Sequence, residues 1–139
     1  AALALGACGA NMGTRFMATA EAPIHENVKR QIVANDERDT VLVFREFRNS
    51  ARVARNSVSE RIAEISRRPG ATFADVAELA SGRRGRTAVL AEGDVEGGMW
   101  WAGQAQGLIH DVGSCADVVR TIVAEAERII TDRLPAAVI

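Results

Sequence analysis

Met12-Gly13-Thr14 is the segment of this sequence whose residue types best suit a binding site. A glycine lets the backbone approach a ligand closely, its amide can point at an anion, and the following threonine hydroxyl donates a further hydrogen bond. Gly-Thr turns are common and mostly structural, so their meaning depends on what precedes them. Residues 9–12 read as a short buried strand, and α/β barrels bind phosphate in turns that follow such strands. The pattern therefore predicts an anion site, which Asn11 enters as part of the same turn.

A second group of candidate residues follows the glycine-rich acidic loop at 93–98. It consists of Trp100, Trp101 and Gln104. Amphipathic aromatic side chains suit the wall of a ligand pocket, but tryptophans after a Gly-Gly pair serve equally well as packing anchors. Both interpretations stay open. Histidine is a common catalytic base, but His25 and His110 stand alone in the sequence, so we expect them at surface or helix-cap positions.

The sequence contains no recognisable metal site. Cys8 and Cys115 are far apart and belong to no cluster of cysteine and histidine, so a structural zinc ion has no ligand set. Two separate thiols fit a reducing cytoplasm better than a disulfide scaffold, although they could pair with each other. We therefore expect a cytoplasmic protein without bound metal.

Composition and charge describe a soluble globular chain with no nucleic-acid or membrane partner. The 139 residues are 47% hydrophobic and 25% charged, with a net charge of −1. Ten arginines face five acidic residues between Arg45 and Arg86, but only Phe47 and Phe73 interleave with them, which favours a solvated helical surface over an RNA-binding face. The apolar residues 1–7 lack a preceding basic region and are too short to span a bilayer, so we expect neither a signal peptide nor an anchor.

Local signals predict a mostly helical chain. We expect the end of a helix over residues 1–7 that Gly6 closes, a helix over 23–34 that stops at Asn35-Asp36, and a helix that begins at Ser57, which has the capping-box spacing to Glu60. A short helix is expected after Thr72 and Asp75, with Phe73, Val76 and Leu79 inward and Gly82 as its stop. Another helix is expected near 84–92, and a final amphipathic helix should run from Ser114 to about Arg133. Residues 40–44 are rich in β-branched and aromatic types and could be extended, although they do not alternate. A strand at 9–12 would then lack a sheet partner within the chain.

The order of several short motifs resembles the nitronate monooxygenase (2-nitropropane dioxygenase-like) flavoproteins. Residues 2–7 followed by Asn11-Met12-Gly13-Thr14-Arg15-Phe16-Met17-Ala18-Thr19 are similar to the last helix-to-strand passage of that family's barrel. Further similar stretches follow in the family's order: Arg48-Asn49-Ser50-Ala51-Arg52-Val53, Ser81-Gly82, Gly93-Asp94, Trp101-Ala102-Gly103-Gln104 and Gly107-Leu108-Ile109. The resemblance covers about residues 1–134, and such ordered agreement is more specific than any one motif.

The resemblance implies an α/β fold, the C-terminal part of an FMN-binding (β/α)8 TIM barrel, in a segment that is itself mostly α-helical. Residues 1–19 would hold the end of barrel helix 7, strand 8 and the phosphate-binding turn, and 20–112 a mainly helical inserted cap. Residues 113–134 would form the closing barrel helix and 135–139 a tail. On this interpretation the chain is a C-terminal piece of a longer enzyme and is inactive by itself, and the rest of the barrel supplies the strand partners of residues 9–12.

The resemblance also assigns the cofactor contacts. It places four residues at the FMN phosphate: Asn11, Met12, Gly13 and Thr14. Backbone amides and the Thr14 hydroxyl would donate the hydrogen bonds, while Arg15 would add charge or pair with a structural carboxylate. The catalytic histidine of nitronate-oxidising members lies on an earlier barrel strand, so no catalytic residue is expected in this chain.

Two reactions of small-molecule substrates compete within this resemblance: oxidation of alkyl nitronates with O2, and NAD(P)H-dependent reduction of a quinone. The Arg-Asn-Ser-Ala-Arg-Val and Trp-Ala-Gly-Gln stretches resemble these members more than the flavin enoyl-acyl-carrier-protein reductases, but they do not separate the first two. A hypothesis of another functional class is that the chain is a small helical interaction domain without catalysis, which would dimerise through the apolar stripe of its final helix.

Overall fold

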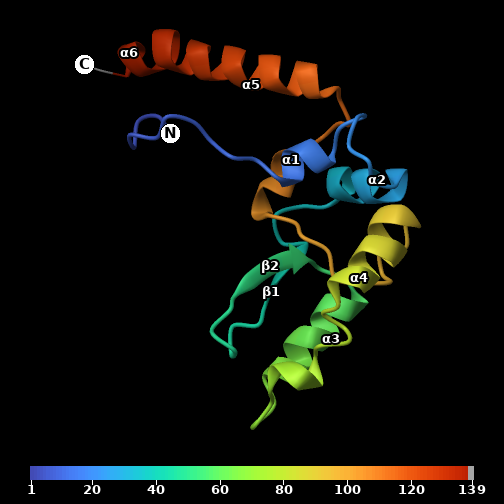
Figure 1. Cartoon of the computed structure of the whole chain (residues 1–139). Coiled ribbons are helices and arrows are strands. Elements are labelled where there is room, and N and C mark those ends of the chain that lie inside the picture. Colours follow the sequence, from blue (N-terminus) through green and yellow to red (C-terminus); the bar gives the residue numbers. More distant parts are fainter. Residues whose placement is uncertain (138–139) are drawn as a thin grey trace.

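The computed structural model describes residues 1–137, which form several short helices, one long C-terminal helix and one β-hairpin. Helices α1 (Thr14–Met17) and α2 (Glu26–Ala34) precede strands β1 (Thr40–Val43) and β2 (Ala51–Ala54) and helix α3 (Ser57–Ser66). The 3₁₀ turn η1 (Phe73–Asp75) leads to α4 (Gly82–Arg84), which continues as the π-helical η2 (Gly85–Ala91). After the 3₁₀ segment η3 (Gln104–Leu108), one long helix is made of α5 (Cys115–Arg128), the π-helical η4 (Ile129–Arg133) and α6 (Leu134–Ala136). In Figure 1 the hairpin lies at one edge of the molecule, with α3 and α4 on one side of it and α1 and α2 above.

The hairpin confirms the extended segment predicted at 40–44 and adds a strand that was not predicted. β1 and β2 pair antiparallel from Thr40 opposite Ala54 to Val43 opposite Ala51. β2 was not predicted because two of its four residues are alanine, which is a poor strand former. Phe44 in the loop between the strands has a φ of 61°, a left-handed conformation that is uncommon for a bulky residue.

Two groups of buried apolar side chains hold these elements together. The first joins α2, η2 and the segment after the glycine-rich loop, and it contains Ala18, Val28, Ile32, Ala54, Val89, Trp100, Ala102 and Ile109. The second packs the hairpin on α3, and it contains Val43, Phe44, Val53, Val58, Ile62, Ala63 and Val76. β2 contributes to both groups, so the hairpin connects the two halves of the core.

Helix α2 ends where the sequence predicts but begins at Glu26 rather than near Pro23, and the cap of α3 also differs from the prediction. His25 is the N-cap of α2, where its Nδ1 accepts a hydrogen bond from the Asn27 amide at 3.1 Å, and the helix ends before Asn35 as predicted. The prediction of Ser57 as the cap of α3 is wrong by one residue. Asn56 is the N-cap, and it forms a capping box with Ser59.

The first residues confirm one prediction and correct another. The Gly6 amide donates to Leu3 O and the Ala7 amide to Ala2 O, with Gly6 at a φ of 90°, and this pattern is a Schellman motif at a helix C-terminus. The buried strand predicted at 9–12 is wrong for the chain as described, because these residues are exposed and irregular. An extended segment becomes a strand only when a neighbour pairs with its backbone groups.

Two helices differ from expectation in what they bury. Thr72 and Asp75 do form a capping box, but Phe73 is 51% exposed and Gly82 begins α4 rather than ending the preceding segment. The final helix begins after Ser114 as predicted. Its apolar stripe, however, is largely uncovered, since Val123 is 59% exposed.

Candidate functional site

The turn that begins α1 meets the segment around Gly103, although the two lie far apart in the sequence. The Gly103 amide donates a hydrogen bond to Thr14 Oγ1 at 3.0 Å. Gly103 is the N-cap of η3, so the bond joins the starts of two short helical elements. The structure thus brings together the two groups of residues that the sequence singled out separately.

The donors of this turn suit an anion such as a phosphate. Within residues 1–137, the amides of Gly13, Thr14 and Arg15 donate to no other group. Thr14 Oγ1 already accepts from Gly103, so its own proton remains to be donated elsewhere. A Cβ on Gly13 would meet nothing within 4 Å, so there is open space above the turn for a ligand.

The other two residues of the predicted turn are also accessible. Asn11 is exposed, and Met12 is 37% exposed. Met12 lines an apolar groove of about 640 Å³ between the first residues and the final helix, where Ile122 and Val123 face it. Met12 therefore connects the turn to this groove.

Arg15 serves a structural role, which was one of its two predicted roles. Its Nη1 donates to the Asp111 carbonyl and its Nη2 to Asp111 Oδ1, both at 2.9 Å. The guanidinium is mostly covered, whereas the Asp111 carboxylate is largely exposed. These bonds fasten α1 to the loop that precedes α5.

Trp100 and Trp101 have different environments. Trp100 is 3% exposed in the core, and its Nε1 donates to Val95 O at 3.2 Å, so the packing interpretation fits it and the pocket interpretation does not. Trp101 is 60% exposed and pairs with Val53 in a β-bridge, and Gln104 is exposed at the start of η3. Since both flank Gly103, Trp101 and Gln104 remain candidates for lining a pocket beside the turn.

Two segments that are far apart in the sequence, around Thr19 and around Gly113, meet just behind the turn. Thr19 forms a parallel bridge with Gly113, and the Ala20 amide donates to Gly113 O at 2.9 Å. The Glu21 carboxylate accepts from the Cys115 amide at the start of α5, and this bond lowers the pKa of Glu21. Residues 20–112 therefore begin and end at neighbouring points of the structure.

Two buried polar residues near this point were missed by the sequence reasoning. Lys29 is 2% exposed, and its Nζ donates to Ala20 O at 3.2 Å and pairs with Glu26 at 2.8 Å. Gln106 is completely buried, and its Nε2 donates to Asp36 O at 2.8 Å. The sequence contains no other lysine, and this was the one signal that could have drawn attention to Lys29. No pattern distinguished Gln106 from its neighbours.

The histidines and the other side chains that can bind a metal add no further site within the described residues. His25 caps α2 and His110 is exposed, as predicted. In the described part of the chain, no group of three or more histidine, cysteine, aspartate or glutamate side chains could hold a metal ion. Nor does any helix within residues 1–137 have the length and apolar character needed to cross a membrane.

Comparison with known proteins adds a family match. The family model described as nitronate monooxygenase matches residues 1–125. A nitronate monooxygenase of Paraburkholderia phytofirmans is 31% identical over 92% of this chain and 33% of its own length. The (3aS,4S,5R,7aS)-5-hydroxy-7a-methyl-1-oxo-octahydro-1H-indene-4-carboxyl-CoA dehydrogenases of Mycobacterium tuberculosis and Rhodococcus jostii are 26% and 27% identical over 91% of this chain and 45% of theirs.

A solved structure matches the fold as a whole. FabK from Thermotoga maritima superposes with a TM-score of 0.87 and 31% identity, over 99% of this chain and 42% of FabK. This chain thus spans less than half the length of each of these relatives.

Proposed function

The chain belongs to the nitronate monooxygenase family of oxidoreductases, and from this we propose that it forms part of an FMN-dependent enzyme of the nitronate monooxygenase type. Its fold is the corresponding part of a (β/α)8 barrel, in a segment that is mostly helical. The observation that carries the proposal is the hydrogen bond between Thr14 and Gly103 inside the matched region, because it joins the predicted phosphate turn to the Trp101-Ala102-Gly103-Gln104 motif of the resemblance.

In this proposal the turn binds the phosphate tail of FMN. The amides of Gly13 and Thr14 and the Thr14 hydroxyl donate to the phosphate oxygens, and Asn11 and Met12 complete the turn. Such donors need no titration, so they hold the cofactor across a wide range of pH. Bound FMN would supply the redox chemistry, while this chain's residues bind and orient it.

The residues behind the turn keep it in place. Arg15 ties α1 to the loop before α5, and Thr19 and Ala20 bond to Gly113. These bonds connect the turn to both ends of residues 20–112. A phosphate site built on such cross-connected backbone is preorganised, which lowers the cost of ordering it on binding.

Three substrate classes are compatible with the relatives. The Paraburkholderia relative supports oxidation of an alkyl nitronate with O2, which we favour, and reduction of a quinone by NAD(P)H is the alternative from the same resemblance. The names of the two actinobacterial relatives add a CoA thioester as a third class. The groups that choose among them are not among the residues of the turn.

The test uses the full-length protein. We expect it to retain FMN through purification and to consume O2 when an alkyl nitronate is added. Oxidation of NAD(P)H with a quinone, without nitronate-dependent O2 uptake, would move the assignment to the quinone reductase. Absence of bound FMN and of both activities would refute the proposal.

A second candidate function comes from the uncovered stripe of α5. Val119 and Val123 are 49% and 59% exposed, which suits a small helical interaction domain that dimerises through this face. A monodisperse, cooperatively melting 139-residue chain without flavin would favour this reading. We expect instead that the isolated chain is poorly folded and inactive.

A further inference from the structure

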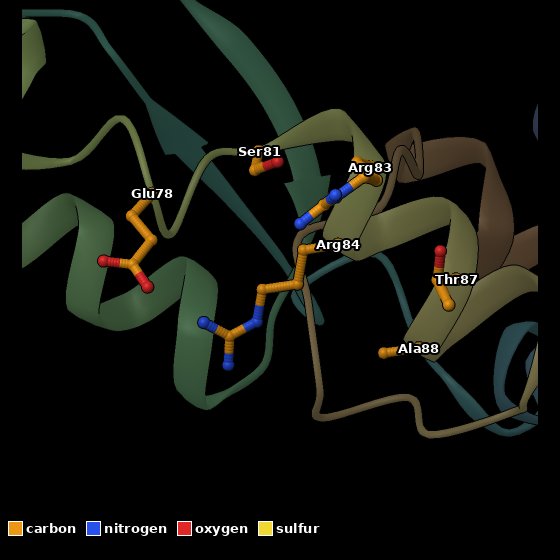
Figure 2. A pocket seen from close by; sticks show the side chains of 6 residues that line it. All are labelled: Glu78, Ser81, Arg83, Arg84, Thr87 and Ala88. Atoms are coloured by element: carbon orange, nitrogen blue, oxygen red, sulfur yellow. The ribbon is translucent and has the colours of Figure 1, made fainter.

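A surface pocket of about 620 Å³ lies on the side of the molecule formed by α4 and η2 (Figure 2). It is lined by Glu78, Ser81, Arg83, Arg84, Thr87 and Ala88. Figure 2 shows Arg83 and Arg84 on one turn of the helix, Thr87 on the next turn and Glu78 on the preceding segment. None of these residues belongs to the turn proposed to bind FMN.

Two arginines, Arg83 and Arg84, line the pocket with one carboxylate, Glu78, and a third arginine, Arg86, lies next to the lining in sequence. Arg83, Arg84 and Arg86 fall within four consecutive positions, and none forms an ion pair within residues 1–137. A Cβ on Gly82 would lie 3.3 Å from Arg86 Nη1, so the Arg86 guanidinium folds back toward the start of α4. Ser81 forms no capping hydrogen bond, so its hydroxyl is also available.

The helix that presents these arginines is held tightly against the glycine-rich loop. Arg84 Nε donates to Gly97 O at 2.6 Å, which orients the guanidinium and leaves its two terminal nitrogens to face the pocket. A Cβ on Gly85 would lie 2.4 Å from Met99 O, so the helix and the loop are in direct backbone contact. The position of the Arg84 guanidinium is therefore set before any ligand arrives.

The loop is in turn fixed to α3. Asn56 Nδ2 donates to Val95 O at 2.8 Å and to Gly98 O at 2.9 Å, and the Asn56 side chain is buried. A chain of short contacts thus runs from the cap of α3 through the loop to Arg84. This connection is what distinguishes the pocket from a solvated basic surface.

We propose that this pocket binds the phosphorylated adenosine of a second substrate. The inference rests on the two alternatives to nitronate oxidation given under the proposed function, because NAD(P)H and CoA thioesters both carry a phosphorylated adenosine. Guanidinium groups bind phosphate through paired, charge-assisted hydrogen bonds, which Arg83 and Arg84 can supply. The Ser81 and Thr87 hydroxyls can donate to the same group.

Glu78 indicates a nucleotide rather than a bare anion. Its carboxylate on the same pocket would repel free phosphate, but it can accept hydrogen bonds from a ribose hydroxyl or from the adenine amino group. The volume of the pocket also falls in the range of small-molecule sites, about 300–1,000 Å³, and exceeds what a phosphate ion needs.

The experiment measures nucleotide affinity by calorimetry with the full-length protein. The probes are adenosine 2′,5′-bisphosphate, which is part of NADPH, adenosine 3′,5′-bisphosphate, which is part of CoA, and unphosphorylated adenosine. The test variant is the double change Arg83→Gln and Arg84→Gln. Arg67→Gln is the matched control, since Arg67 is likewise exposed and unpaired within residues 1–137 but lies at the end of α3.

We expect a bisphosphate to bind the unchanged protein at least about tenfold more tightly than adenosine, and the double variant to lose about tenfold or more of that affinity. The control variant should keep it, and circular dichroism should show all three proteins folded. A preference for the 2′ or the 3′ isomer identifies the nicotinamide nucleotide or CoA as the source. Failure of both bisphosphates to bind, or an equal loss in the Arg67 variant, would overturn the proposal.

Flavin content separates this result from the test of the proposed function. A protein that retains FMN but binds neither bisphosphate refutes the pocket alone. A protein that binds a bisphosphate through Arg83 and Arg84 but never binds FMN refutes the flavoenzyme proposal and keeps the nucleotide pocket.

Discussion

Replacement of Thr14 by valine should weaken the binding of FMN while leaving the binding of riboflavin almost unchanged. Valine has nearly the shape of threonine but lacks the hydroxyl, so the change removes the atom that accepts from the Gly103 amide at 3.0 Å. Riboflavin lacks the phosphate to which the Thr14 hydroxyl is proposed to donate. The comparison of the two flavins therefore isolates the phosphate contact.

The size of the effect follows from the two bonds involved. A hydrogen bond to a charged group contributes about 1.5–3 kcal/mol, so the dissociation constant of FMN should rise about ten- to a hundredfold. Loss of the acceptor for the Gly103 amide costs about 1 kcal/mol more. That second cost lowers the stability of the apoprotein and affects both flavins alike, so it cancels in the comparison.

The assay is fluorescence titration of the full-length apoprotein with each flavin, together with thermal melting of the apo forms. Thr14→Ser is the matched control, because serine keeps the hydroxyl and should retain most of the FMN affinity. An equal loss for FMN and riboflavin would show that Thr14 acts only through packing. Unchanged FMN affinity in the valine variant would refute the phosphate contact.

Three further predictions concern the residues that support the site. Asn56→Ala should cost about 2–4 kcal/mol of stability, because it removes the cap of α3 and takes the side-chain donor from the buried Gly98 carbonyl, while Val95 O keeps its bond from Trp100 Nε1. Ser57→Ala should cost about 0.5 kcal/mol or less, and equal costs in denaturant unfolding would contradict the cap assignment. The hydrogen bond from Lys29 lowers the pKa of Glu26 below its usual 4.5, so this carboxylate stabilises the fold above that pH and its contribution is lost as the pH falls. Glu26→Gln should lower the Tm at pH 7 and should make the Tm fall less steeply as the pH is lowered. A Tm of the variant that falls as steeply in acid as that of the unchanged protein would count against the pair. Arg15→Gln should cost about 1–3 kcal/mol of stability, because it removes both bonds to Asp111. Arg15→Lys should restore little of this stability, because lysine lacks the forked geometry that makes both bonds. Full rescue by lysine in thermal melts would argue against that geometry.

The parts of the fold that the sequence predicted well depend on interactions within a few residues. The Schellman motif at Gly6, the capping box of Thr72 with Asp75 and the cap at Ser114 each close within one helical turn, so their signals are local. The cap of α3 illustrates the limit. Asn56 rather than Ser57 is the cap, and Asn56 also bonds to Val95 and Gly98, about forty positions away.

The residues of the candidate site likewise divide into those that local sequence predicts and those that depend on distant contacts. The residue types of the turn at Thr14 were sufficient to predict an anion site, because the required donors are adjacent in sequence. The bond from Gly103 joins residues separated by 89 positions, and the burial of Lys29 depends on where Ala20 passes, so neither follows from a local pattern. Trp100 and Trp101 are neighbours of one type, and only the fold shows that one is buried and the other exposed.

The two regions that differ most from expectation lie on either side of the groove that Met12 lines. Residues 9–12 lack a strand partner, and the apolar stripe of α5 lacks a covering surface, and together they form the groove of about 640 Å³. In Figure 1 the first residues run alongside α5, apart from the hairpin and α3. The Thr14 turn stands where this exposed part meets residues 20–112, whose two ends meet at the bridge between Thr19 and Gly113. A cofactor phosphate at that point would contact both parts at once, so we expect flavin binding and the docking of residues 20–112 on the barrel to stabilise each other.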